Sequence, residues 1–297
     1  MSFYQGRLTI PKMSRLDEEQ KKVEQELVSI VENREEADKA YNKIRGSLNG
    51  KVLCVDLARY LSPAYRSNKP RSRHIWTPAT FNPAMVYIVD RLDREIRNSR
   101  KNSPLLLILT GGPGSGKTTC VKLDKIEEAD LIFDGTMTRF EADQKLIDQT
   151  LLFGWRVELY FVHRPYHDMV LSMLQRTQLT GRYVGLGKGK DMSRMHVESL
   201  ICFEQAFYNF RERRNIEFYV VEPKSSGEAV YLDVKEFLSR PRPTVKSLLT
   251  TEEKAMAEFI RSGGDERVVE LCQKGTRLQT TLEKREHNHL YWNKCNL

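Results

Sequence analysis

Hydrophobic residues along the chain fall into short runs separated by segments of helical spacing. The short runs predict buried strands, and they cover residues 51–55, 104–110, 129–134, 155–162 and 216–221. Hydrophobic side chains three or four positions apart predict helices at residues 83–100, 139–153, 165–177, about 191–214 and 228–239. Strands that alternate with helices form mostly parallel sheets covered on both faces. The pattern therefore predicts an α/β fold of three layers, in which residues 62–78 and 181–190 are loops.

The N-terminal end departs from this alternation. Residues 14–45 carry a thin apolar stripe among dense charges, which predicts one long helix with Ser14 as its N-cap. Two interpretations stay open for this helix. It packs on the surface of the core, or it serves as an arm that binds a partner or inhibits the protein.

The C-terminal end departs from it as well. The run Arg240-Pro-Arg-Pro243 marks a boundary, and two further helical patterns follow at residues 250–262 and 265–286. We therefore expect three units: an N-terminal helical arm (1–50), an α/β core (51–240) and a C-terminal helical extension (241–297).

A glycine-rich segment follows the predicted strand at 104–110. It matches the phosphate-binding pattern Gly111-x-x-x-x-Gly116-Lys117-Thr118 in full. Glycines let the backbone turn tightly around a phosphate, and the helix that follows adds its positive dipole end. Lys117 is expected to reach the β- and γ-phosphates of ATP or another nucleoside triphosphate, and the Thr118 hydroxyl to join a Mg²⁺ shell. The predicted nucleotide site consists of Gly111, Gly112, Pro113, Gly114, Ser115, Gly116, Lys117, Thr118 and Thr119.

Charge and composition narrow the class of partner. The chain of 297 residues has 48 Lys and Arg against 40 Asp and Glu, a net charge of +8, which suits anionic partners without choosing among them. Its five cysteines are scattered without a CxxC pair, which argues against a zinc site or a disulfide framework. No stretch approaches the roughly 18–20 apolar residues of a membrane span, and the N-terminus has no apolar signal region. We expect a cytoplasmic protein, with export that needs no cleavable signal left open.

Two aspartates stand at the ends of predicted strands, where open α/β sheets collect their ligands. Asp134 ends the run 129–134, as a Walker-B aspartate would, so it is a candidate for holding Mg²⁺ or a substrate hydroxyl. Asp56 follows the run 51–55. A kinase that phosphorylates an alcohol needs a carboxylate to orient the hydroxyl and take its proton. Asp56 fits that role and fits equally well the start of a short helix at residues 57–61.

Arginines cluster in and around the glycine-rich stretch after residue 177. Arginines on such a segment can close over a phosphoryl group in transfer and neutralise its developing charge. Arg176 and Arg194 are the first candidates for this role, and Arg182 is the third.

Several of these segments together resemble the zeta toxin kinases. The resemblance rests on Thr110-Gly-Gly-Pro-Gly-Ser-Gly-Lys-Thr118, on Leu131-Ile-Phe-Asp-Gly-Thr136, and on the arginine-bearing residues 171–194. The family has Glu-Gly-Thr where this chain has Asp134-Gly135-Thr136. The substrate segment follows the phosphate loop in the family, whereas its counterparts here, Val52 to Pro63 and His74-Ile-Trp-Thr-Pro78, precede it. We therefore infer a permuted order of strands.

The resemblance implies a P-loop kinase fold and an ATP- and Mg²⁺-dependent transfer to a hydroxyl of a nucleotide-sugar, with UDP-N-acetylglucosamine the leading candidate. It implies Asp56 as the base, Arg176 and Arg194 as phosphate clamps with Arg182 as the alternate, and Thr77, Asp134 and Arg182 as contacts to the acceptor. It also implies that the N-terminal helix could bind an antitoxin. Two alternatives remain: a polynucleotide or nucleoside kinase, suggested by charge alone, and a non-catalytic module that nucleotide controls. We do not expect nucleic acid or membrane as partners.

Overall fold

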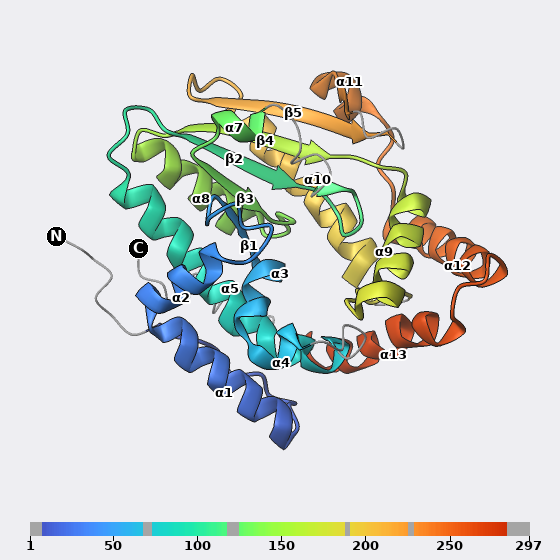
Figure 1. Cartoon of the computed structure of the whole chain (residues 1–297). Helices are drawn as coiled ribbons and strands as arrows, with labels where there is room; N and C mark the ends of the chain where they lie inside the picture. The colour runs from blue at the N-terminus through green and yellow to red at the C-terminus, as the bar shows by residue number, and fades with distance from the viewer. Residues whose placement is uncertain (1–7, 68–72, 118–124, 188–190, 225–228, 284–297) are drawn as a thin grey trace.

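A single sheet forms the centre of the molecule. The computed structural model describes residues 8–67, 73–117, 125–187, 191–224 and 229–283, and within them six strands pair in the order β1-β3-β2-β4-β5-β6 (Figure 1). Neighbouring strands are parallel, except that β6 is antiparallel to β5. Their bounds are β1 Val52–Cys54, β2 Leu105–Thr110, β3 Leu131–Asp134, β4 Arg156–Val162, β5 Ile216–Pro223 and β6 Ala229–Leu232.

Helices cover both faces of the sheet. The helical elements are α1 Glu18–Glu32, α2 Arg34–Asn42, α3 Val55–Ala58, η1 Arg59–Leu61, α4 Pro63–Arg66, α5 Arg73–Asn98, α7 Lys125–Glu128, α8 Phe140–Leu152, α9 Tyr166–Thr180, α10 Asp191–Phe210, α11 Val234–Ser239, α12 Val245–Arg261 and α13 Glu266–Glu283. Every residue of β2 is buried, and its side chains alternate between two hydrophobic clusters. Leu106 and Ile108 pack with α5, α8 and α10, whereas Leu107 lies in the cluster against which Ile126 of α7 packs. The predicted α/β class, with a mostly parallel sheet between helical layers, is confirmed.

Three predicted elements are wrong in detail. The single helix at 14–45 is two helices, because Asn33 ends α1 and caps α2, and the N-cap of α1 is Asp17 rather than Ser14. The predicted loop at 62–78 contains α4 and the first turn of α5, which continues through two prolines. Residues 229–232, predicted as helix, form the edge strand β6 before α11 begins. The ring of Tyr231 packs against Tyr219 on the neighbouring strand β5 and against Tyr160 on β4, a long-range contact that local spacing does not encode.

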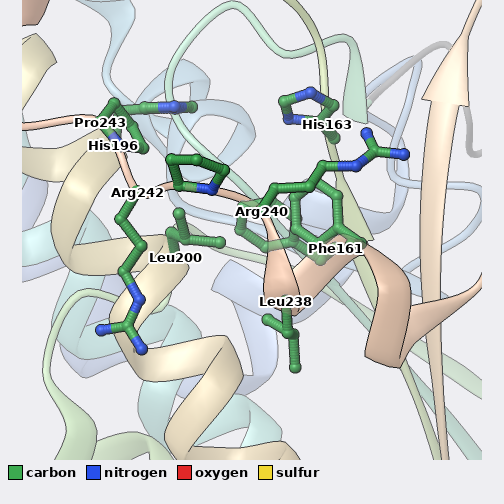
Figure 2. A pocket seen from close by; sticks show the side chains of 10 residues that line it. Phe161, His163, His196, Leu200, Leu238, Arg240, Arg242 and Pro243 are labelled. Carbon is green, nitrogen blue, oxygen red and sulfur yellow. The ribbon is translucent and has the colours of Figure 1, made fainter.

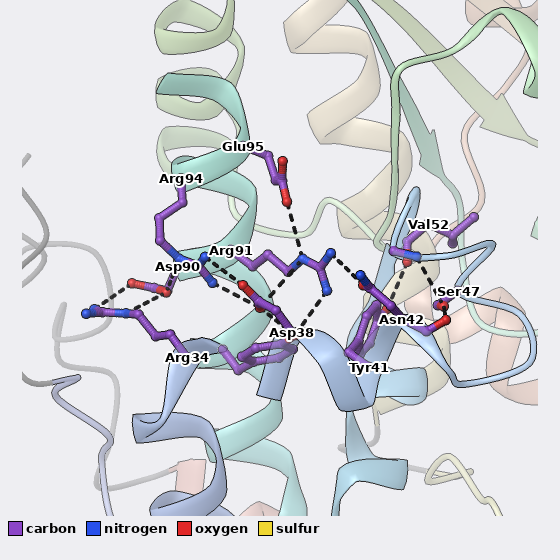
Figure 3. Close-up of polar contacts among 12 residues, drawn as sticks. Arg34, Asp38, Tyr41, Asn42, Ser47, Val52, Asp90, Arg91, Arg94 and Glu95 are labelled. Carbon is purple, nitrogen blue, oxygen red and sulfur yellow. Dashed lines mark hydrogen bonds and ion pairs between the residues drawn. The ribbon is translucent and has the colours of Figure 1, made fainter. Parts of the chain in front are cut away.

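The helix pair α1 and α2 is packed against α5. Leu27, Val31 and Tyr41 are fully buried in the largest hydrophobic cluster. Figure 3 shows a polar network beside them, in which Arg34 and Arg94 bind Asp90, and Arg94 also binds Asp38.

Tyr41 also fixes the strand β1. Its hydroxyl donates a hydrogen bond to the carbonyl of Val52 at 2.9 Å and accepts one from the amide of Cys54 at 3.0 Å. The N-terminal helices therefore hold the outer edge of β1, the strand that leads to Asp56.

Leu27→Ala is expected to lower the free energy of unfolding by about 2–5 kcal/mol, since it empties a fully buried position between α1 and the core. The exposed neighbour Glu26→Ala is the matched control, with an expected change within about 0.5 kcal/mol. Urea denaturation followed by circular dichroism measures both. Equal stabilities for the two variants would contradict this packing.

None of the helices in the described part of the chain combines the length and the apolar character needed to cross a membrane.

Candidate active site

The phosphate-binding pattern forms a tight loop between β2 and the start of the next helix. Gly111 and Gly114 adopt φ values of +130° and +78°, in the left-handed region that favours glycine. A Cβ atom at Gly111 would lie 2.5 Å from the carbonyl oxygen of Val162, and one at Gly114 would lie closer still to that of Met169. The loop therefore needs glycine for its backbone angles and for its close approach to β4 and α9.

Two polar groups of this loop face inward. The Nζ atom of Lys117 donates to the carbonyl oxygens of Gly111 at 2.7 Å and Gly112 at 3.2 Å. The Ser115 hydroxyl is 1% exposed and has no hydrogen-bond partner among the described atoms. An ammonium group held by carbonyls of its own loop and an unpartnered hydroxyl both fit an anion bound in the loop. Thr118, Thr119 and the rest of the predicted helix lie outside the described residues.

The register of the sheet brings both candidate aspartates to the same end as the loop. Asp134 is the last residue of β3 and pairs with Leu109 of β2 on one side and with Cys54 of β1 on the other. Asp56 lies two residues beyond Cys54, in the first turn of α3. Burial raises the pKa of Asp134, with the positive charge of Lys117 opposing it and the negative charge of Asp56 adding to it.

Asp56 lies among positive charges. Its carboxylate forms an ion pair with the guanidinium of Arg182 and another with Arg59 Nη1 at 3.2 Å. Burial alone would raise the pKa of Asp56, but the charges of Arg182 and Arg59, followed by Arg176 and Lys117, hold it below its ordinary value. The side chain is 38% exposed, so the ionised carboxylate stays open to solvent or substrate.

The candidate arginines lie in different surroundings. Arg182 follows Gly181, which ends α9 in the left-handed conformation. Arg176 lies on the last turns of α9, where burial lowers its pKa and its Nε atom has no hydrogen-bond partner in the described residues. Arg194 lies near the start of α10, with its Nε atom 3.8 Å from Glu198. The guanidinium groups that act on Asp56 thus include Arg182 and Arg176, together with Arg59.

Sequence reasoning missed Arg59. Its spacing of three residues from Asp56, in the segment where a short helix was one of the open alternatives, is the signal that could have found it. Thr77, the remaining candidate, lies in α5, and its hydroxyl donates to the carbonyl of Arg73 at 2.9 Å.

No group of three or more His, Cys, Asp or Glu side chains suited to a metal ion occurs among the residues that the structure describes.

A cavity of about 240 Å³ lies between α10, α11 and the segment 240–243 (Figure 2). His196 in its lining also lies against Gly112 of the phosphate loop. Two arginines of the lining are paired with carboxylates, Arg240 with Glu236 and Arg242 with Glu204. Asp56, Lys117 and Asp134 are not among its lining residues.

Comparisons with known proteins give distant likenesses to solved structures. No protein-family model matches the chain, and no curated protein matches it. A solved structure from work on the PezAT chromosomal toxin–antitoxin system of Streptococcus pneumoniae is similar over 58% of this chain and 94% of that chain. The identity is 14% and the TM-score 0.35, a likeness too distant to assign an activity.

Proposed function

We propose that this protein is an ATP-dependent kinase that transfers the γ-phosphate to a hydroxyl group of a nucleotide-sugar or a similar small metabolite. The observation that carries the proposal is the meeting of the glycine loop and Lys117 with an ionised carboxylate and three arginines at one end of the sheet. UDP-N-acetylglucosamine is the leading acceptor, on the strength of the motifs shared with the zeta toxin kinases.

The nucleotide is proposed to bind along residues 111–119. Lys117 exchanges the carbonyls of Gly111 and Gly112 for the β- and γ-phosphates, and the buried hydroxyl of Ser115 gains a partner. Thr118 and Asp134 are the proposed protein ligands of Mg²⁺, which neutralises phosphate charge when it is bound. The proposal takes support from the loop geometry and from the position of Asp134 beside the loop.

Asp56 is proposed to orient the acceptor hydroxyl and to accept its proton as the oxygen attacks the γ-phosphorus. The bond from the γ-phosphorus to the bridging oxygen then breaks, and ADP leaves. The low pKa of Asp56 makes it a weak base while its carboxylate is paired with Arg182 and Arg59. Phosphate oxygens that attract Arg182 and Arg176 weaken this pairing, so the pKa of Asp56 rises once the substrates are bound.

The other assignments extend the same proposal. Arg176 and Arg182 are proposed to bind the transferring phosphoryl group, which their positive charges beside Asp56 support. Arg194, 3.8 Å from Glu198, is proposed as a further phosphate contact. Thr77 is proposed to contact the acceptor. The three-unit division and an antitoxin that binds the exposed face of α1 remain proposals of the sequence, and α1 uses its other face for the core.

Mass spectrometry tests this function directly. The purified protein is incubated with ATP, Mg²⁺ and a pool of small metabolites, with UDP-N-acetylglucosamine alone and an oligonucleotide alone in parallel samples. We expect a product heavier by one phosphate together with an equal amount of ADP. An oligonucleotide as the only phosphorylated species, or ATP bound without any product, would contradict the proposal and favour one of the two alternatives.

A further inference from the structure

The segment that carries Arg182 is fastened to the C-terminal helices. Residues 181–187 run from the end of α9 without regular secondary structure, and α12 packs along α9 beside them (Figure 1). We infer that α12 and α13 position Arg182 for catalysis, and that the buried carboxylate of Glu252 is the residue that does so. The inference rests on the proposed function. It adds a positioning residue that lies in the C-terminal helices, beyond the α/β core at residues 51–240.

Glu252 joins the two ends of this region. Its side chain is fully buried in α12, and Oε1 accepts a hydrogen bond from the Tyr166 hydroxyl at 2.5 Å. Oε2 accepts one from the amide of Gly187 at 2.6 Å. Tyr166 begins α9, and Gly187 lies five residues after Arg182. One carboxylate therefore connects the start of the arginine-bearing helix to the far end of the arginine-bearing segment.

Apolar contacts strengthen the same attachment. Leu186 is fully buried in a cluster with Met256 of α12 and Val269 of α13, and its amide donates to the carbonyl of Cys272 at 3.1 Å. Arg182 itself is tied back to α9, because its carbonyl accepts from the Thr177 hydroxyl at 2.7 Å. The backbone on both sides of Arg182 is thus held, while its guanidinium extends to Asp56.

Burial of the Glu252 carboxylate carries a free-energy penalty. Removing a carboxylate from water costs free energy that hydrogen bonds only partly offset. At buried positions in general, an apolar side chain of similar size commonly packs with a smaller penalty. What an apolar side chain cannot do is accept from the Gly187 amide and the Tyr166 hydroxyl at once. The presence of Glu252 is therefore explained by the geometry it imposes on the segment.

Glu252→Ala tests the inference, with the adjacent exposed Glu253→Ala as the matched control. A displacement of about 1 Å at a catalytic group commonly lowers rate by about 100-fold, so we expect Glu252→Ala to lower kcat by about 10- to 100-fold. The Kd for ATP is expected to change much less than kcat, because the phosphate loop is continuous with β2 and packs against the end of β4 as well as against α9. Amide hydrogen exchange in residues 181–187 is expected to speed up in Glu252→Ala and not in Glu253→Ala.

A conservative variant separates positioning from general damage. In Glu252→Gln the amide oxygen can accept from Gly187 while the amide nitrogen donates to the Tyr166 oxygen, so its kcat is expected to stay within about fivefold of wild type. Wild-type kcat and exchange in Glu252→Ala would overturn the inference, as would a loss of ATP affinity equal to the loss of kcat. If the wild-type protein transfers no phosphate, the proposed function fails, and exchange in residues 181–187 alone decides whether Glu252 holds the segment.

Discussion

Lys117→Ala is expected to lower kcat for phosphate transfer by at least about 100-fold, the usual loss when one fixed donor to a developing negative charge is removed. In the structure the Lys117 ammonium is half-buried, and it donates only to carbonyls of its own loop in the contacts described. Burial lowers its pKa, whereas the nearby Asp134 carboxylate favours the charged form. A phosphate provides a stronger partner for this cation than two carbonyls do, so its loss also weakens nucleotide binding.

Lys101→Ala is the control for this experiment. Lys101 is an exposed lysine that forms an ion pair with Asp130 near the opposite end of β2. We expect its kcat and its Kd for ATP to equal those of the wild-type protein. Steady-state assays with ATP and the acceptor identified by mass spectrometry measure both variants. An unchanged rate in Lys117→Ala would contradict the proposal that residues 111–119 bind the triphosphate for transfer.

Asp56→Asn is expected to lower kcat by about 10²- to 10⁴-fold, the range for removal of a general base, while the Kd for ATP changes little. The amide keeps the size of the carboxylate but cannot accept the hydroxyl proton. It also leaves Arg182 and Arg59 without their common negative partner, so thermal stability is expected to fall.

The control replaces an aspartate in a comparable ion pair away from the sheet end. Asp93 pairs with Arg97 one helical turn later in α5, at 2.9 Å. Asp93→Asn is therefore expected to cost some stability and none of the activity. Isothermal titration with ATP and steady-state kinetics separate binding from transfer in both variants. Full transfer by Asp56→Asn would refute its role as the base.

The strands β1, β2 and β4 could be predicted from the sequence because almost all of their residues are buried, on both faces of the sheet. Leu105 to Leu109 form an unbroken apolar run, and such runs need no long-range information to be recognised. The phosphate loop could be predicted for a similar reason, since its spacing reflects backbone angles within one short segment. Asp56 and Asp134 followed from the rule that parallel strands present ligands at their carboxyl ends.

The course of α5 and the choice among the arginines could not be predicted, because both depend on contacts between segments that are distant in the sequence. The predicted loop at 62–78 included Pro78, yet α5 runs through this proline, and Ala84 and Ile88 of the same helix are buried in the core cluster. The choice among the arginines depended on how residues 181–187 are held, and that is set by Glu252, 65 residues beyond Gly187. A carboxylate in an amphipathic helix is ordinarily taken for a solvated residue, so the sequence offered no sign of this contact.

A crystal structure of the protein with Mg²⁺ and a non-hydrolysable ATP analogue tests the central claim most directly. The account predicts the triphosphate along residues 111–119, Lys117 Nζ moved from the carbonyls of Gly111 and Gly112 onto phosphate oxygens, and the Asp56 carboxylate facing the γ-phosphate. Nucleotide bound in the cavity between α10 and α11, or Asp56 turned away from the γ-phosphate with Lys117 still on its own carbonyls, would contradict it.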